Sequence, residues 1–146
     1  MSQQIIIDYW VEKAIEDLAS ARDNLKSGRY HAVRDAYFAC FHAFSSVLIR
    51  EGKTFKKHKE VRSMLHRDFI RTKKMDRSWG KHYDWLFDNR HKADYRPLIQ
   101  FDADQVKEIV EESEAFLKEM AGLLNRSKQN GEEIQKTKSD QEAEFI

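Results

Sequence analysis

Cysteine, proline and glycine are scarce in this 146-residue chain, which has one, one and five of them. A lone cysteine, Cys40, excludes an intrachain disulfide and favours a reducing, cytoplasmic setting. Its apolar neighbours Ala39, Phe41 and Ala43 predict a small buried side chain rather than a reactive thiol. With so few helix-breaking residues, long helices joined by short connections are expected.

Long apolar runs and familiar catalytic motifs are missing too. No apolar stretch reaches 18 residues, so no membrane span is expected. The first ten residues, MSQQIIIDYW, lack a basic start and a small-residue cleavage site, so they do not predict a signal peptide. There is no HExxH, Gly-rich phosphate loop, zinc spacing or nucleophile elbow. His31 and His42 share a helix face but lie about 16 Å apart along it, so no metal site is predicted.

Charge of one sign is concentrated in two segments, although the net charge is only +1. Residues 50–77 hold eleven Lys or Arg against four Asp or Glu, and residues 101–127 hold three against seven. Such a basic segment is either a solvated surface or a non-specific, salt-sensitive contact for a phosphate backbone. Aromatic residues that could stack on bases are sparse in the basic segment, Phe55 being the obvious one, so sequence-specific RNA recognition is not expected. The basic residues bunch at Lys53, Lys56, Lys57, His58 and Lys59.

Apolar residues at helical spacing predict an all-α fold. We expect an antiparallel up-and-down bundle of four long helices plus one short helix. Asp8 and Asp102 are the expected N-caps of the first and last helices, and Pro97 ends the fourth. Residues 1–127 are predicted to form one domain and residues 128–146 a disordered tail. The predicted helices cover residues 8–26, 28–50, 58–71 (the short one), 79–95 and 102–127.

The segment 28–52 is the centre of this prediction because it is apolar on two sides. A helix of that kind is usually packed between neighbours. The only polar strip left on it holds His31, Asp35 and His42. One side carries Tyr30, Tyr37, Phe41, Phe44 and Leu48, and the other carries Ala32, Ala36, Ala39, Ala43 and Val47.

Two arginines interrupt the apolar stripes. Arg34 lies within about 40° of Tyr30, and Arg90 within about 20° of the Trp79–Leu86 line of its helix. An unpaired buried charge is very costly, so these guanidiniums need partners. We expect Arg34 and Arg90 to meet in one polar pocket. It either forms a buried ionic network that fixes how the helices pack, with Asp94 one turn after Arg90 as a partner, or holds a phosphate.

Three segments, in order and spacing, resemble the HEPN superfamily (higher eukaryote and prokaryote nucleotide-binding domains), and in particular its small stand-alone prokaryotic members. They are RDAYFACFHA from Arg34, GKTFKKH from Gly52 and RHKADY from Arg90. The resemblance covers about two-thirds of the chain. It implies a helical bundle that commonly forms a homodimer, often beside a minimal nucleotidyltransferase encoded next door. Many such pairs are toxin–antitoxin modules whose HEPN member is a metal-independent RNase.

The RNase motif of that family is incomplete here. It is an Arg-x4–6-His pair, usually composite across the dimer, that binds phosphate and transfers protons. After Arg90 the corresponding positions hold Tyr95, Arg96 and Pro97, preceded by Asp94. An ionised aspartate cannot readily protonate a leaving group. Arg77 and His82 match the motif literally but stand at the wrong end of their helix, so we interpret them as coincidence.

These observations favour a dimeric nucleotide- or RNA-phosphate-binding component of a two-gene module with a minimal nucleotidyltransferase. The alternatives are an RNase with an atypical acid such as His42, His58 or His91, and a non-catalytic assembly partner. No cofactor is expected beyond a bound nucleotide or anion, and the catalytic candidates are Arg90, Asp94 and His42. By resemblance, Tyr95 is also a candidate for modification by the transferase. The predicted ligand-binding residues are Arg34, Tyr37, His42, His58, Arg90, Asp94 and Tyr95.

Overall fold

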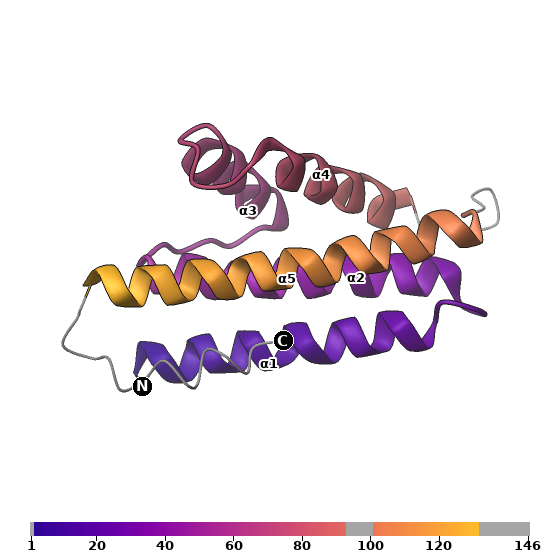
Figure 1. Ribbon diagram of the computed structural model, residues 1–146, viewed down its shortest axis with the longest axis horizontal. Coiled ribbons are helices and arrows are strands. Elements are labelled where there is room, and N and C mark those ends of the chain that lie inside the picture. The colour runs from indigo at the N-terminus through magenta and orange to yellow at the C-terminus, as the bar shows by residue number, and fades with distance from the viewer. Residues whose placement is uncertain (1, 93–100, 132–146) are drawn as a thin grey trace.

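The computed structural model describes residues 2–92 and 101–131, with side chains described over 2–90 and 101–126. The described residues contain helices and no strand, which confirms the predicted all-α bundle. Successive long helices alternate in direction, and α3 and α4 lie together on one side of the α2 and α5 pair (Figure 1). The elements are α1 (Gln3–Asp23), α2 (Arg29–Arg50), α3 (His58–Met64), the π-helical turn η1 (Leu65–Ile70), α4 (Arg77–Lys92) and α5 (Ala103–Gly131).

Helix α2 is the centre of the bundle, as its two apolar sides predict. It packs against α1, α4 and α5. Tyr37, Phe44 and Leu48 on its aromatic side are fully buried, and so are the four alanines of the opposite side. The polar strip meets α1, where the Asp35 carboxylate accepts hydrogen bonds from Ser20 Oγ (2.9 Å) and Asn24 Nδ2 (3.0 Å). Cys40 is buried as predicted.

The first helix begins earlier in the chain than predicted. Helix α1 begins at Gln3 rather than Asp8, because Ser2 is the N-cap and its Oγ accepts a hydrogen bond from Ile5 N (3.3 Å). Ile7, two turns before Ala14 on the same face, is 1% exposed, so the apolar stripe starts earlier than predicted. Asp102 is confirmed as the cap of α5, since its carboxylate accepts from Gln105 N (3.2 Å).

The end of α5 also differs from the prediction. As described, the helix continues through Gly131, past the expected domain boundary at residue 127. The remaining residues of the predicted tail, 132–146, lie outside the described residues, as do residues 93–100. No helix within the described ranges is both long and apolar enough to cross a bilayer.

The short third helix changes its winding partway along. Val61, Leu65 and Phe69 form its buried face as predicted, but the chain turns π-helical after Met64. The π-turn is marked by the wide hydrogen bond from Arg71 N to His66 O (2.8 Å). Apolar residues spaced by four can stay on one face of such a wide turn, so the sequence pattern does not distinguish it from an α-helix.

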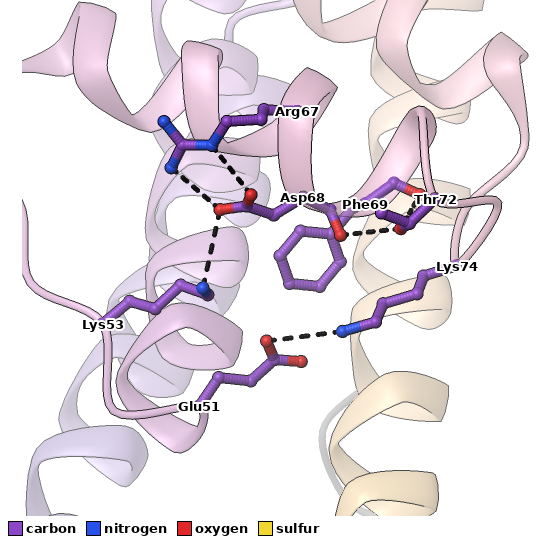
Figure 2. Close-up of polar contacts among 7 residues, drawn as sticks. All are labelled: Glu51, Lys53, Arg67, Asp68, Phe69, Thr72 and Lys74. Atoms are coloured by element: carbon purple, nitrogen blue, oxygen red, sulfur yellow. Dashed lines mark hydrogen bonds and ion pairs between the residues drawn. The ribbon is translucent and has the colours of Figure 1, made fainter.

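Ion pairs fasten η1 and the turn after it to the end of α2 (Figure 2). Lys53 Nζ lies 3.5 Å from Asp68 Oδ2, and Lys74 Nζ lies 3.8 Å from Glu51 Oε1. Beneath them the ring of Phe69 packs edge-on against Phe44, with centroids 5.0 Å apart. The buried rings contribute most of the stabilisation here, because exposed ion pairs are typically worth about 0–1 kcal/mol. This contact fixes α3 and η1 over α2.

Candidate phosphate-binding site

Three helices bring Tyr37, His58 and Arg90 together. The Tyr37 hydroxyl, on α2, is 2.8 Å from Nδ1 of His58, the first residue of α3. The His58 ring stacks almost parallel on Phe41, with centroids 4.2 Å apart. From α4, the guanidinium carbon of Arg90 lies 4.8 Å from the centre of the Tyr37 ring and 5.5 Å from that of Phe87. The set joins a cation, an imidazole and a phenol.

One buried polar atom at this place, Nε of Arg90, has no hydrogen-bond partner among the described residues. The buried hydroxyl of Tyr83, whose ring lies 5.8 Å from that of Tyr37, interacts with the Tyr37 hydroxyl. Buried polar groups in native proteins are nearly always paired with protein, water or ligand. The guanidinium of Arg90 is thus neither fully hydrogen-bonded nor paired with a described carboxylate, and its positive charge can be balanced by a bound anion.

Burial and the neighbouring cation set the charge states of the site. Burial lowers the pKa of His58, and the positive charge of Arg90 lowers it further. The imidazole is therefore neutral at pH 7, with one nitrogen that donates and one that accepts. Burial raises the pKa of Tyr37, against the opposing charges of Arg90 and Arg62, so the phenol stays protonated. Arg90 supplies the only formal charge of the three.

Sequence reasoning missed a second cation, Arg62 of α3. Its guanidinium carbon lies 4.3 Å from the centre of the Phe87 ring, which Arg90 also contacts. Its Nη1 is 3.5 Å from Asp88 Oδ1 and 4.0 Å from Asp84 Oδ1. A signal was present, because Arg62 follows His58 by four residues and therefore shares its helix face.

Arg34 does not join Arg90, and the expectation of a pocket built from these two arginines is wrong. Its side chain is exposed. The calculated angle put Arg34 at the edge of the aromatic stripe, and Tyr30 on that edge is itself only half buried. Arg90, near the described end of α4, contacts α2 at Tyr37. Arg34 lies one helical turn before that contact. A helical wheel gives direction but not this position along the axis.

His42 belongs to the seam between α1 and α2. Its Nδ1 is 2.6 Å from the Asp17 carboxylate, and its ring stacks on Trp10 with centroids 5.0 Å apart. The candidates Asp94 and Tyr95, and the side chain of His91, lie outside the described residues.

The literal Arg-x4-His match does not form a site. The side chain of Arg77 is exposed, whereas His82 is 6% exposed and bonded through Nε2 to Ser113 Oγ (3.0 Å) of α5. No three His, Cys, Asp or Glu side chains gather as a metal site would require within the described part of the chain.

The structure is an all-helical bundle in which an arginine packs on aromatic rings where α2, α3 and α4 meet. Comparison with known proteins gives the family of this helical-bundle protein. The HEPN domain family matches residues 7–129, and the chain belongs to that family. A "UPF0332 protein" of Thermotoga maritima is 36% identical over 120 residues, 82% of this chain and 91% of that one. "Putative toxin MJ0142" of Methanocaldococcus jannaschii is 26% identical over 109 residues, 73% of this chain and 74% of that one.

Proposed function

We propose that this HEPN-domain protein binds the phosphate groups of a nucleotide or of RNA at Tyr37, His58 and Arg90. The observation that carries the proposal is the setting of Arg90. Ring faces hold its guanidinium, no described carboxylate pairs with it, and its buried Nε has no partner among the described residues. A planar guanidinium packed on rings keeps its N–H donors in its own plane, where phosphate oxygens can accept them.

The surroundings of the cluster fit the same ligand. His58 is neutral and can donate to a phosphate oxygen or accept from a hydroxyl. The exposed Lys56, Lys57 and Lys59 stand beside it at the start of α3 and add long-range attraction for a polyanion. Belonging to the HEPN family, together with a relative named as a putative toxin, supports a nucleic-acid-directed role.

We further propose that the protein acts as a homodimer in a two-gene toxin–antitoxin module with a minimal nucleotidyltransferase. The family and the name of the archaeal relative support this proposal. The adjacent open reading frame tests it, followed by co-expression and co-purification of the two products. An unrelated neighbour, or two products that elute separately, would contradict the module.

Binding to a fluorescein-labelled oligoribonucleotide in EDTA tests the phosphate site. A hydrogen bond to a charged group contributes about 1.5–3 kcal/mol, so Arg90→Ala should weaken binding by roughly tenfold or more. The matched control is Arg71→Ala, which removes an exposed arginine from the end of η1. It should change the affinity less than about twofold, as a rim charge does. Equal losses in the two variants would show a diffuse basic surface instead of a site.

A metal-independent RNase is the second candidate, and the position of His58 favours it. His58 contacts the ring that carries Arg90, whereas His42 is held by Asp17. A neutral His58 would take the proton of an RNA 2′-hydroxyl as its oxygen attacks phosphorus. It would return a proton to the departing 5′-oxygen, with Arg90 balancing the phosphorane charge. Cleavage in EDTA that is lost in His58→Gln and kept in His42→Gln supports this mechanism. If the wild type does not cleave RNA, phosphate binding without cleavage is the function that remains.

A further inference from the structure

Two guanidiniums contact one phenylalanine ring, yet only one of them has carboxylate partners among the described residues. Arg62 from α3 and Arg90 from α4 both lie over Phe87. Asp84 and Asp88 sit beside Arg62. Both guanidinium carbons lie within 5.5 Å of the centre of this ring, so an anion bound beside it is attracted by both positive charges.

The carboxylates hold Arg62 loosely. Its distances to Asp88 (3.5 Å) and Asp84 (4.0 Å) exceed the 2.7–2.9 Å of a close charge-assisted hydrogen bond. The side chains of Arg62 and Asp88 are 35% and 60% exposed, so water screens their attraction. The guanidinium can therefore change partners at little cost.

Arg67, five residues further along, is held firmly and provides the contrast. Its Nε and Nη2 donate to the two carboxylate oxygens of Asp68 at 2.8 and 3.0 Å. The same contact lowers the pKa of Asp68 to about 2. Arg67 is therefore an arginine of the same segment that already has a two-point contact with a carboxylate of its own.

The π-helical turn gives Asp84 a second partner. His66, in η1, lies one turn after Arg62, and its Nε2 is 2.9 Å from Asp84 Oδ1. Asp84 can thus keep a hydrogen bond when Arg62 turns away. Asp88 has no described partner besides Arg62, so it is the group that competes with a ligand for this guanidinium. Departures from regular α-helix of this kind occur frequently at functional sites.

We propose that Arg62 is a second phosphate-binding residue. When a phosphate binds, the Arg62 guanidinium moves from Asp88 to the phosphate, while Asp84 keeps its contact with His66. The inference rests on the proposed phosphate site at Arg90. With two guanidiniums around Phe87, the site selects ligands that carry two neighbouring phosphates. Such a pair comes either from a nucleoside diphosphate or from consecutive phosphodiesters of RNA, and the two sources share the same chemistry.

The test compares affinities for one and two phosphates. One arm uses AMP against ADP, and the other uses a dinucleotide against a trinucleotide, both with hydroxyl ends. In the wild type the two-phosphate ligand should bind more tightly in at least one arm, and that arm identifies the source. Arg62→Gln should reduce this preference about tenfold, whereas the matched Arg67→Gln should change it less than twofold.

Asp88→Asn tests the competition in the opposite direction. Without the competing carboxylate, binding of the two-phosphate ligand should tighten about two- to fivefold. Glu16→Gln makes the same charge change on the exposed side of α1 and should leave the affinity unaltered. Tightening in both variants would reveal a general charge effect and overturn the inference.

Other outcomes separate the two proposals. If Arg90→Ala abolishes binding but Arg62→Gln weakens both members of a pair equally, or neither, the inference fails and the Arg90 site stands. A wild type without any preference for two phosphates would likewise overturn the inference and leave the Arg90 site intact. If Arg90→Ala binds like the wild type, the proposed function itself is wrong.

Discussion

His42 and His58 occupy two seams of the same helix bundle with similar geometry and different partners. Each imidazole stacks on an aromatic ring, Trp10 for His42 and Phe41 for His58. In the seam between α1 and α2, His42 contacts the carboxylate of Asp17 at 2.6 Å. In the seam of α2 with α3 and α4, His58 contacts a phenol, and the positive charge of Arg90 adds to the effect of burial in lowering its pKa.

The difference between these partners separates a structural contact from a functional one. In the first seam the imidazole of His42 and the carboxylate of Asp17 satisfy each other within the protein. The second holds a cation on ring faces, and the buried Nε of that cation has no described partner. Proteins retain such unsatisfied groups where function requires them, and other parts of the fold supply the stability. The following predictions test this division of roles.

The largest effect is expected from the core that both seams share. Phe44 of α2 is fully buried and packs against Phe69 of η1. Phe44→Ala leaves a cavity and should lower the free energy of unfolding by about 3–5 kcal/mol. Urea unfolding followed by circular dichroism measures it, and a loss below about 1 kcal/mol would show that α3 and η1 do not depend on this contact.

His82 should make the fold sensitive to acid. Burial lowers its pKa from 6.5 to about 4, so the unfolded chain binds a proton at a higher pH than the folded chain does. Stability should therefore fall as the pH drops from about 6.5 to about 4. At 1.36 kcal/mol per unit, the cost at pH 5 is roughly 2 kcal/mol relative to pH 7.

The control for this prediction is His82→Gln, which keeps a donor for Ser113 and cannot titrate. Urea unfolding at pH 7 and pH 5 should show a smaller loss in the variant by about that amount. Glu112, 4.0 Å from His82 Nδ1, works in the opposite direction, because burial raises its pKa and its protonation favours the folded state. Identical losses in wild type and variant would exclude His82 as the source.

The two histidine partners should differ in their value to stability. Asp17→Ala removes the carboxylate from His42 and should cost about 1.5–3 kcal/mol, the range for hydrogen bonds to charged groups. Tyr37→Phe removes only a neutral hydroxyl from His58 and should cost about 0.5–1.5 kcal/mol. Thermal and urea unfolding of both variants measure the difference. The reverse order would contradict the division into a structural and a functional seam.

The smallest effects come from two glycines within helices. A Cβ on Gly80 of α4 would lie 2.9 Å from His66 Cε1, so Gly80→Ala should disturb the His66–Asp84 pair. We expect a net loss of about 1 kcal/mol, since crowding outweighs the gain in helix propensity. On α5, a Cβ at Gly122 meets only the far end of the Arg126 side chain, at 3.3 Å. Gly122→Ala should raise the free energy of unfolding by about 0.5–1 kcal/mol. If both variants change the free energy of unfolding in the same direction, crowding at Gly80 is not the cause.

Much of the fold follows from apolar spacing alone. The two apolar sides of α2 predict its central position, and Asp102 is a cap as its sequence context indicates. The sequence does not reveal the start of α1, because Asp8 is a plausible N-cap. The buried face of the helix in fact begins before it, at Ile7. The π-turn leaves no trace in the pattern, since Leu65 and Phe69 fit either winding.

The candidate site could be predicted only in part. Tyr37, His58 and Arg90 were predicted together and do lie together, although their binding role stays a proposal. The sequence wrongly places Arg34 in the predicted pocket and fails to indicate Arg62, and both errors have one cause. Angular position on one helix does not say which stretch of it a neighbouring helix covers, and that depends on how α3 and α4 cross α2.

Thermal unfolding of wild type and Arg90→Ala, each with and without ADP or a short oligoribonucleotide, tests the central claim most directly. A ligand that binds only the folded state raises the midpoint, and loss of its site removes that rise. We predict that Arg90→Ala unfolds within about 2 °C of the wild type without ligand and shows no ligand-induced rise. A variant that unfolds many degrees lower and still responds to ligand would show that Arg90 supports the fold and that phosphate binds elsewhere.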